Sequence, residues 1–156
     1  MRRASIIGVA ATAAMGLGVS GAAAAGNARH KRSFTAVAVG AQISAIGNRF
    51  ETVYRVIRSP DGGGAGRQDS VLLGSTYPVT GNDTMTLFYA DGVQRTSDTF
   101  TRAAPRTDGI GEISGKGTCT TGSGLHKGEK CSYTFTGTYD LNTGVTKLRF
   151  AGTFTR

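Results

Sequence analysis

Polar and apolar residues alternate along most of this chain with a period of two. In 131–139 the odd positions are Cys, Tyr, Phe, Gly and Tyr, whereas every even position is Ser or Thr. This alternation is typical of a strand with one buried face, and no window shows a sustained period of 3.6. We therefore predict strands over eight segments: 34–43, 48–58, 69–77, 83–90, 93–102, 111–120, 130–139 and 145–155.

The segments between these strands contain residues typical of turns. We interpret 61–64 as a flexible loop, and 80–83 and 141–144 as turns. Asp91 and Gly92 form the strongest hairpin signal, because both central residues of a type I′ turn need positive φ. Evenly spaced strands with short connections predict an all-β fold. We expect a closed eight-stranded antiparallel up-and-down β-barrel of lipocalin-like shape, since closure removes exposed strand edges.

The last three strands can be aligned from their side chains. If Cys119 lies opposite Cys131, then Gly117 lies opposite Tyr133. The following turn places Gly152 on the other side of Tyr133, so that this ring lies between two glycines. Large and small residues then alternate across the wall, which fills a narrow barrel without overpacking.

The N-terminus resembles a targeting segment and not part of the barrel. A basic start is followed by an apolar, Ala-rich run that ends at an A-x-A site, which predicts a signal peptide over 1–25. Residues 26–33 are expected to form a flexible basic arm, and 34–156 the barrel domain. The protein is then secreted, with no membrane contact after the signal is removed; the sequence does not distinguish Sec from twin-arginine export.

The formal charge of +8 falls to +6 when Arg2 and Arg3 are removed with the signal. The remaining basic residues are scattered along the chain, apart from a cluster at 29–32. Such a surface attracts polyanions without reading sequence, so no specific nucleic-acid partner is expected.

The two cysteines allow three interpretations: a metal site, a catalytic Cys/His pair or a disulfide. A structural zinc site needs four Cys or His ligands, and only Cys119, Cys131 and His126 are at hand, so we expect no metal. Catalysis needs a free thiolate, but cysteines of an exported protein readily pair. We predict a Cys119–Cys131 disulfide across a hairpin, with His126 solvated in its loop.

The loop at 121–128 reads TGSGLHKG, and this T-G-[SG]-G-x-x-x-G pattern resembles the glycine motif of the allene oxide cyclase barrel superfamily. Plant allene oxide cyclases and dirigent proteins share this motif. The segments 84–92 and 48–51 add weaker similarity. The resemblance implies the barrel fold, and its bacterial members include cofactor-free cyclases. The family's catalytic Glu and Asn match no particular position here, and the signal peptide and the cysteine pair depart from the pattern.

The Asp91-Gly92 turn sets the orientation of the neighbouring strands. It places Tyr89 opposite Gln94 and Met85 opposite Asp98, on the face that also carries Leu87 and Phe100. Asp98 is then the candidate catalytic acid, with a pKa raised by burial, and the alternative is that it meets water at the end of the barrel. The expected ligand-lining residues are Tyr54, Met85, Tyr89, Gln94, Phe100, Tyr133 and Phe135.

Two functions are compatible with this reading. One is a lumen that binds a small apolar molecule, with cofactor-free isomerase or cyclase activity implied by the resemblance. The other is a non-catalytic binding or structural barrel with a filled core. No cofactor is expected in either case, and no G-x-S-x-G or HExxH pattern suggests a hydrolase. Val53 and Ile57 lie opposite the inner face of their strand, where we expect a contact between copies of the chain.

Overall fold

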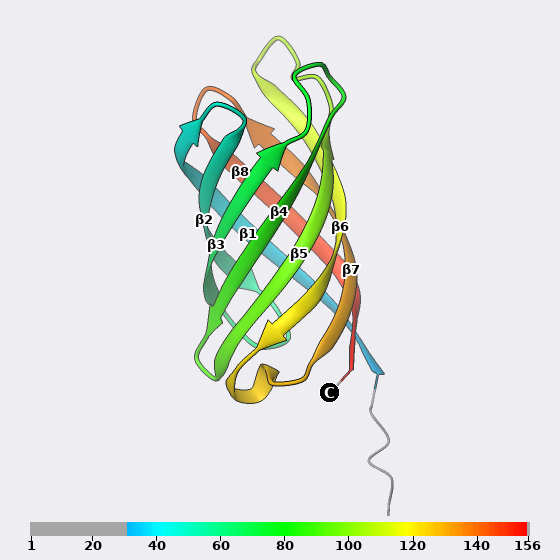
Figure 1. Cartoon of the computed structure of the whole chain (residues 1–156). Helices are drawn as coiled ribbons and strands as arrows, with labels where there is room; N and C mark the ends of the chain where they lie inside the picture. The colour runs from blue at the N-terminus through cyan, green and yellow to red at the C-terminus, as the bar shows by residue number, and fades with distance from the viewer. Residues whose placement is uncertain (1–30, 156) are drawn as a thin grey trace, which may run out of the picture.

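The computed structural model describes residues 31–155, which form a closed antiparallel barrel with the strands in sequence order (Figure 1). The chain runs up and down around the barrel, and β1 pairs with β8 to close it. The strands are β1 (Lys31–Ile46), β2 (Arg49–Arg58), β3 (Gly64–Leu72), β4 (Val79–Tyr89), β5 (Gly92–Arg102), β6 (Ile110–Gly122), β7 (Lys130–Asp140) and β8 (Val145–Thr155). A short 3-10 helix, η1 (Gly124–His126), connects β6 to β7.

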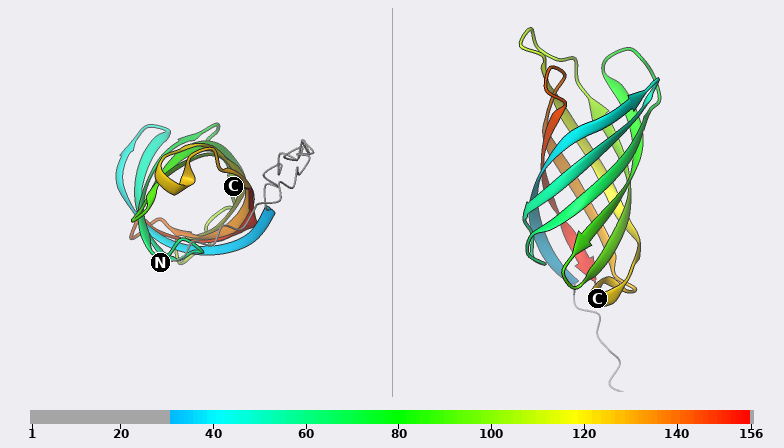
Figure 2. Two further views of the ribbon diagram at one scale, coloured as in Figure 1. Left: turned by 90° about the horizontal axis from the view of Figure 1, so that it is seen from below. Right: turned by 90° about the vertical axis from the view of Figure 1, so that its left-hand side faces the viewer.

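The predicted fold class is therefore confirmed. The expected signal peptide and most of the basic arm lie outside the described residues, and β1 begins at Lys31. Because the strands alternate in direction, the β2–β3, β4–β5 and β6–β7 connections meet at one end of the barrel, which we call the η1 end. Figure 2 shows η1 lying over part of the opening at this end.

The predicted register of β6, β7 and β8 is also confirmed. Gly117 pairs with Tyr133, and Tyr133 pairs with Gly152 on the other side. A Cβ atom added at Gly152 would lie 2.5 Å from the Cβ atom of Tyr133, so the glycine provides space that a larger residue would remove. The pattern of large and small residues was sufficient to align these three strands.

Two expectations about β3 and β4 are wrong. The third strand runs over Gly64–Leu72 and not over 69–77, and the expected turn at 80–83 lies inside β4. The reason is visible at Gly81, where an added Cβ atom would lie 2.2 Å from Cζ of Phe100. This glycine makes room for an aromatic ring in a strand, whereas we interpreted it as a turn residue.

Candidate functional site

The lumen contains a small apolar cavity towards the η1 end. Its volume is about 50 Å³, enough for a few water-sized groups but well below that of a typical drug-sized site. Four of the predicted ligand-lining residues line it: Met85, Tyr89, Gln94 and Tyr133. Ser59, Asp61 and Glu129 contribute its polar lining.

The other three predicted lining residues are buried in the core beyond this cavity. The Tyr54 hydroxyl donates to Oε1 of Gln68 at 2.8 Å, and Phe135 packs against Phe150 with ring centroids 5.6 Å apart. Phe100 packs edge-on against Phe50 at 6.3 Å. The lumen is therefore filled by side chains away from the η1 end.

Arg102 closes the filled half of the lumen. Its guanidinium carbon lies 4.2 Å from the ring centre of Phe50, 4.9 Å from that of Tyr139 and 5.5 Å from that of Phe100. Cation–π contacts with three rings hold the charge against otherwise apolar surroundings. Arg102 therefore helps to fill the lumen at the end opposite η1.

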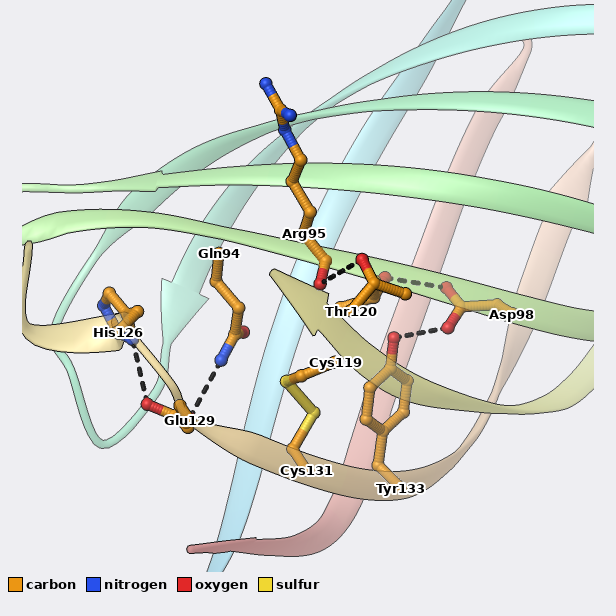
Figure 3. The surroundings of a disulfide bond; sticks show 10 residues. Gln94, Arg95, Asp98, Cys119, Thr120, His126, Glu129, Cys131 and Tyr133 are labelled. Atoms are coloured by element: carbon orange, nitrogen blue, oxygen red, sulfur yellow. Dashed lines mark hydrogen bonds and ion pairs between the residues drawn. A yellow bond between two sulfur atoms is a disulfide. The ribbon is translucent and has the colours of Figure 1, made fainter. Parts of the chain in front are cut away.

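Asp98 points inward from β5 and is buried, with 2% of its surface exposed. Its Oδ1 accepts a hydrogen bond of 2.5 Å from the Tyr133 hydroxyl, and its Oδ2 accepts one of 3.3 Å from Thr96 Oγ1 (Figure 3). Asp98 does not itself line the cavity at the η1 end. Tyr133 connects the two, because it lines the cavity and holds the carboxylate.

A glycine makes this contact between strands possible. Gly117 of β6 lies between Asp98 of β5 and Tyr133 of β7 in the register of the sheet. A Cβ atom at Gly117 would lie 1.6 Å from Oδ1 of Asp98 and 2.7 Å from Cζ of Tyr133. The absent side chain therefore leaves the space in which the hydroxyl meets the carboxylate.

A second buried carboxyl group, Asp83, lies directly opposite Asp98. The sequence reading missed it, because the β4–β5 register differs from the predicted one by two residues: Tyr89 pairs with Gly92, Met85 with Thr96 and Asp83 with Asp98. An even shift keeps each side chain on its predicted face, so the inward orientation of Asp98 survives the error.

The two carboxyl groups influence each other's ionisation. Burial and then the charge of Asp98 raise the pKa of Asp83 to about 8, which Gln68 and Arg102 partly oppose. Burial also raises the pKa of Asp98, although hydrogen bonds from Tyr133 and Thr96 favour its charged form. Two adjacent buried carboxylates cannot both ionise easily, so Asp83 keeps its proton at neutral pH while Asp98 accepts hydrogen bonds.

Within residues 31–155 neither carboxyl oxygen of Asp83 makes a hydrogen bond of good geometry, although Asp98 and Gln68 lie close enough to influence its pKa. A buried polar group without a hydrogen bond costs about 1–3 kcal/mol of stability. Such groups are uncommon in native proteins, and a catalytic or ligand-binding role is one reason for them.

The disulfide between Cys119 and Cys131 is confirmed and joins β6 to β7 next to this site (Figure 3). The expectation that His126 is solvated is wrong, since only 1% of its surface is exposed. Its Nδ1 lies 3.1 Å from Oε2 of Glu129, and Glu129 also accepts a hydrogen bond of 2.9 Å from Gln94 Nε2. The loop of the glycine motif is thus folded inward over the η1 end.

Val53 and Ile57 lie on the outer face of β2 and are 40% and 58% exposed. A contact between copies of the chain at this pair stays a prediction. No helix in the described part of the chain is both long enough and apolar enough to cross a membrane.

Comparison of the chain with protein-family models finds no match, and comparisons with curated proteins and with solved structures find none either.

Proposed function

We propose that this protein binds a small apolar molecule, or the apolar end of a longer one, in the cavity at the η1 end. The observation that carries this proposal is the position of Tyr133, which lines the cavity and donates a hydrogen bond to Asp98 of the buried carboxyl pair. The rest of the lumen is filled, so specificity rests on the cavity and on the groups at its mouth. The disulfide and the expected signal peptide support a role outside the cell.

The chemistry that this arrangement supports is proton transfer without a cofactor. Asp83 keeps a proton at neutral pH and is a potential donor, whereas Asp98 is a potential acceptor. Neither carboxyl group lines the cavity, so a proton would pass between the pair and a bound substrate through the Tyr133 hydroxyl. Such a relay suits an isomerisation or a cyclisation, in which the substrate is held in one conformation while a proton moves. The resemblance to the allene oxide cyclase barrels agrees with this class of reaction.

The small volume of the cavity favours a second function, a binding protein without catalysis. A cavity of about 50 Å³ does not enclose a polyene of the size that ring closure needs. In that case the carboxyl pair would serve binding or folding and not turnover.

Calorimetric titration with linear alkanols of increasing chain length tests the binding proposal. We expect binding to strengthen with chain length until the cavity is filled and then to level off. Leu87→Trp places bulk in the cavity and should abolish binding, whereas Phe88→Trp, on the outer face of the same strand, should not. Equal binding by the two variants, or none by the wild type, would contradict the proposal.

Catalysis is tested separately. Native mass spectrometry of protein purified from its own culture medium would reveal a retained molecule, which is then incubated with wild type, Asp98→Asn and the outer-face control Asp69→Asn. We expect wild type and the control to convert it and Asp98→Asn to bind it unchanged. Binding without conversion by all three supports the non-catalytic alternative.

A further inference from the structure

Three loops at the η1 end bring metal-ligating side chains together. Asp61 comes from the β2–β3 loop, Asp91 from the β4–β5 hairpin and His126 from η1. One donor atom from each lies within 4.8 Å of the others. These residues are separate from the carboxyl pair, and they are up to 65 positions apart in the chain, so only the closed barrel places them side by side.

The histidine is held as metal-binding histidines usually are. Its ring is buried and packs against Tyr89 with centroids 5.1 Å apart. Its Nδ1 faces the Glu129 carboxylate at 3.1 Å. A neutral imidazole that donates from Nδ1 to a carboxylate presents the lone pair of Nε2 on the opposite side, and this is the arrangement that orients histidine ligands in zinc sites.

The distance between His126 and Asp91 fits a metal site. His126 Nε2 and Asp91 Oδ1 are 3.3 Å apart. A charged imidazolium paired with a carboxylate is usually closer, at about 2.7–2.9 Å. Two ligands bound about 2.1 Å from a tetrahedral zinc ion lie about 3.4 Å apart, which agrees with the observed separation.

The donor types narrow the choice of metal. We propose that Asp61, Asp91 and His126 bind a divalent transition-metal ion of the zinc class, with Glu129 orienting the histidine. Calcium and magnesium prefer all-oxygen sites, whereas an imidazole nitrogen with carboxylates suits zinc and its neighbours. Three of the chain's ten acidic residues meet here in a protein of net charge +8, and a divalent cation offsets that local negative charge.

The sequence gives no local signal for this site, because two of its three ligands are aspartates far from the cysteine and histidine cluster. No short spacing connects Asp61 to Asp91 or to His126. Their meeting depends on the loops at one end of the barrel, and the sequence alone did not fix how those loops fold.

The test uses untagged mature protein, freed of metal with a chelator. We expect Zn²⁺ to bind with a stoichiometry of one in calorimetry, and saturating Zn²⁺ to raise Tm by about 5 °C or more. Co²⁺ in its place should give the intense visible absorption of a four-coordinate site. Asp61→Asn and Asp91→Asn should each weaken Zn²⁺ binding at least about tenfold, and Glu129→Gln about 10–100-fold.

Two controls separate this site from adventitious binding. His30→Gln removes the chain's other histidine, and Asp69→Asn removes an exposed carboxylate on the outer wall; both should bind Zn²⁺ as the wild type does. The two aspartate variants leave His126 in place, so the test does not depend on a histidine variant that fails to fold. The proposal would be overturned by absence of one-to-one binding, by wild-type affinity in Asp61→Asn and Asp91→Asn, or by loss of binding in His30→Gln.

Discussion

The wall formed by β6, β7 and β8 differs from the wall formed by β3, β4 and β5. In the first, glycines face aromatic rings and a disulfide ties two strands together. In the second, Asp83 and Asp98 face each other inside the lumen, and Asp83 has no good hydrogen bond among the described residues. One wall is arranged for close packing, whereas the other holds groups that reduce stability.

Gly117 and Tyr133 join the two walls. The glycine of β6 provides the space, and the tyrosine of β7 donates its hydrogen bond across that space to Asp98 of β5. The well-packed wall thus holds the carboxyl pair in place. Functional sites in proteins are often arranged in this way, with a well-packed scaffold supporting groups that by themselves disfavour folding.

The largest effect is expected from Gly117→Val, which fills the space between the two walls. The new side chain would overlap with the Asp98 carboxylate and the Tyr133 ring, so we expect the free energy of unfolding to fall by about 3 kcal/mol, the upper end of the usual range for overpacking. Ala151→Val, at an exposed position on β8, is the matched control and should be nearly neutral. Chemical denaturation measures both; a stable Gly117→Val variant would mean that Tyr133 and Asp98 do not meet here.

Removing the disulfide should weaken the packed wall by a similar amount. The bridge closes a loop of twelve residues, and a loop of this size contributes about 3 kcal/mol in the chain-entropy description. The double variant Cys119→Ala, Cys131→Ala should therefore unfold at lower denaturant, and wild type under reducing conditions should match it. Intact mass after alkylation verifies the bond, and two freely alkylated thiols in non-reduced protein would contradict it.

A smaller effect, of opposite sign, is expected in the other wall. Folding raises the pKa of Asp83 from 3.8 to about 8, so its contribution to stability is complete below about pH 4 and is lost as the pH rises to about 8. Asp83→Asn, which stays neutral, should therefore be the more stable protein at pH 8, by at least about 1 kcal/mol. The control Asp69→Asn, on the outer face, should show the same pH dependence of stability as the wild type. If the stabilities of wild type and Asp83→Asn change with pH in parallel, Asp83 is not a buried, protonated carboxyl group.

The sequence was most informative where side-chain size alone determined the alignment. The strict alternation of β7 and the glycines opposite Tyr133 were enough to set the register of three strands. The inward face of Asp98 was also predicted correctly, because a register error of two residues does not change the face of a strand.

The sequence was least informative where glycine has two possible roles. Gly81 and Gly66 face Phe100 and Leu87 inside strands, yet glycine is equally typical of turns and flexible loops. Interpreting 80–83 as a turn removed Asp83 from the candidate residues. The predicted hairpin register, which differs from the observed one by two residues, placed Met85 opposite Asp98 instead. His126 was misplaced for a related reason, since a glycine-rich loop can fold over the barrel end as readily as it can extend into solvent.

The most direct test of the carboxyl pair is a titration of the aspartate side chains by carbon-13 NMR, with Asp83→Asn and Asp98→Asn used to assign the signals. Because the two groups interact, the titration reports values that belong to the pair. We expect the pair to release one proton near pH 8, and this step to disappear in Asp83→Asn. Titration of both carboxyl groups near the ordinary value of 3.8 would show that they do not share a buried site, and would remove the proton donor from the proposed chemistry.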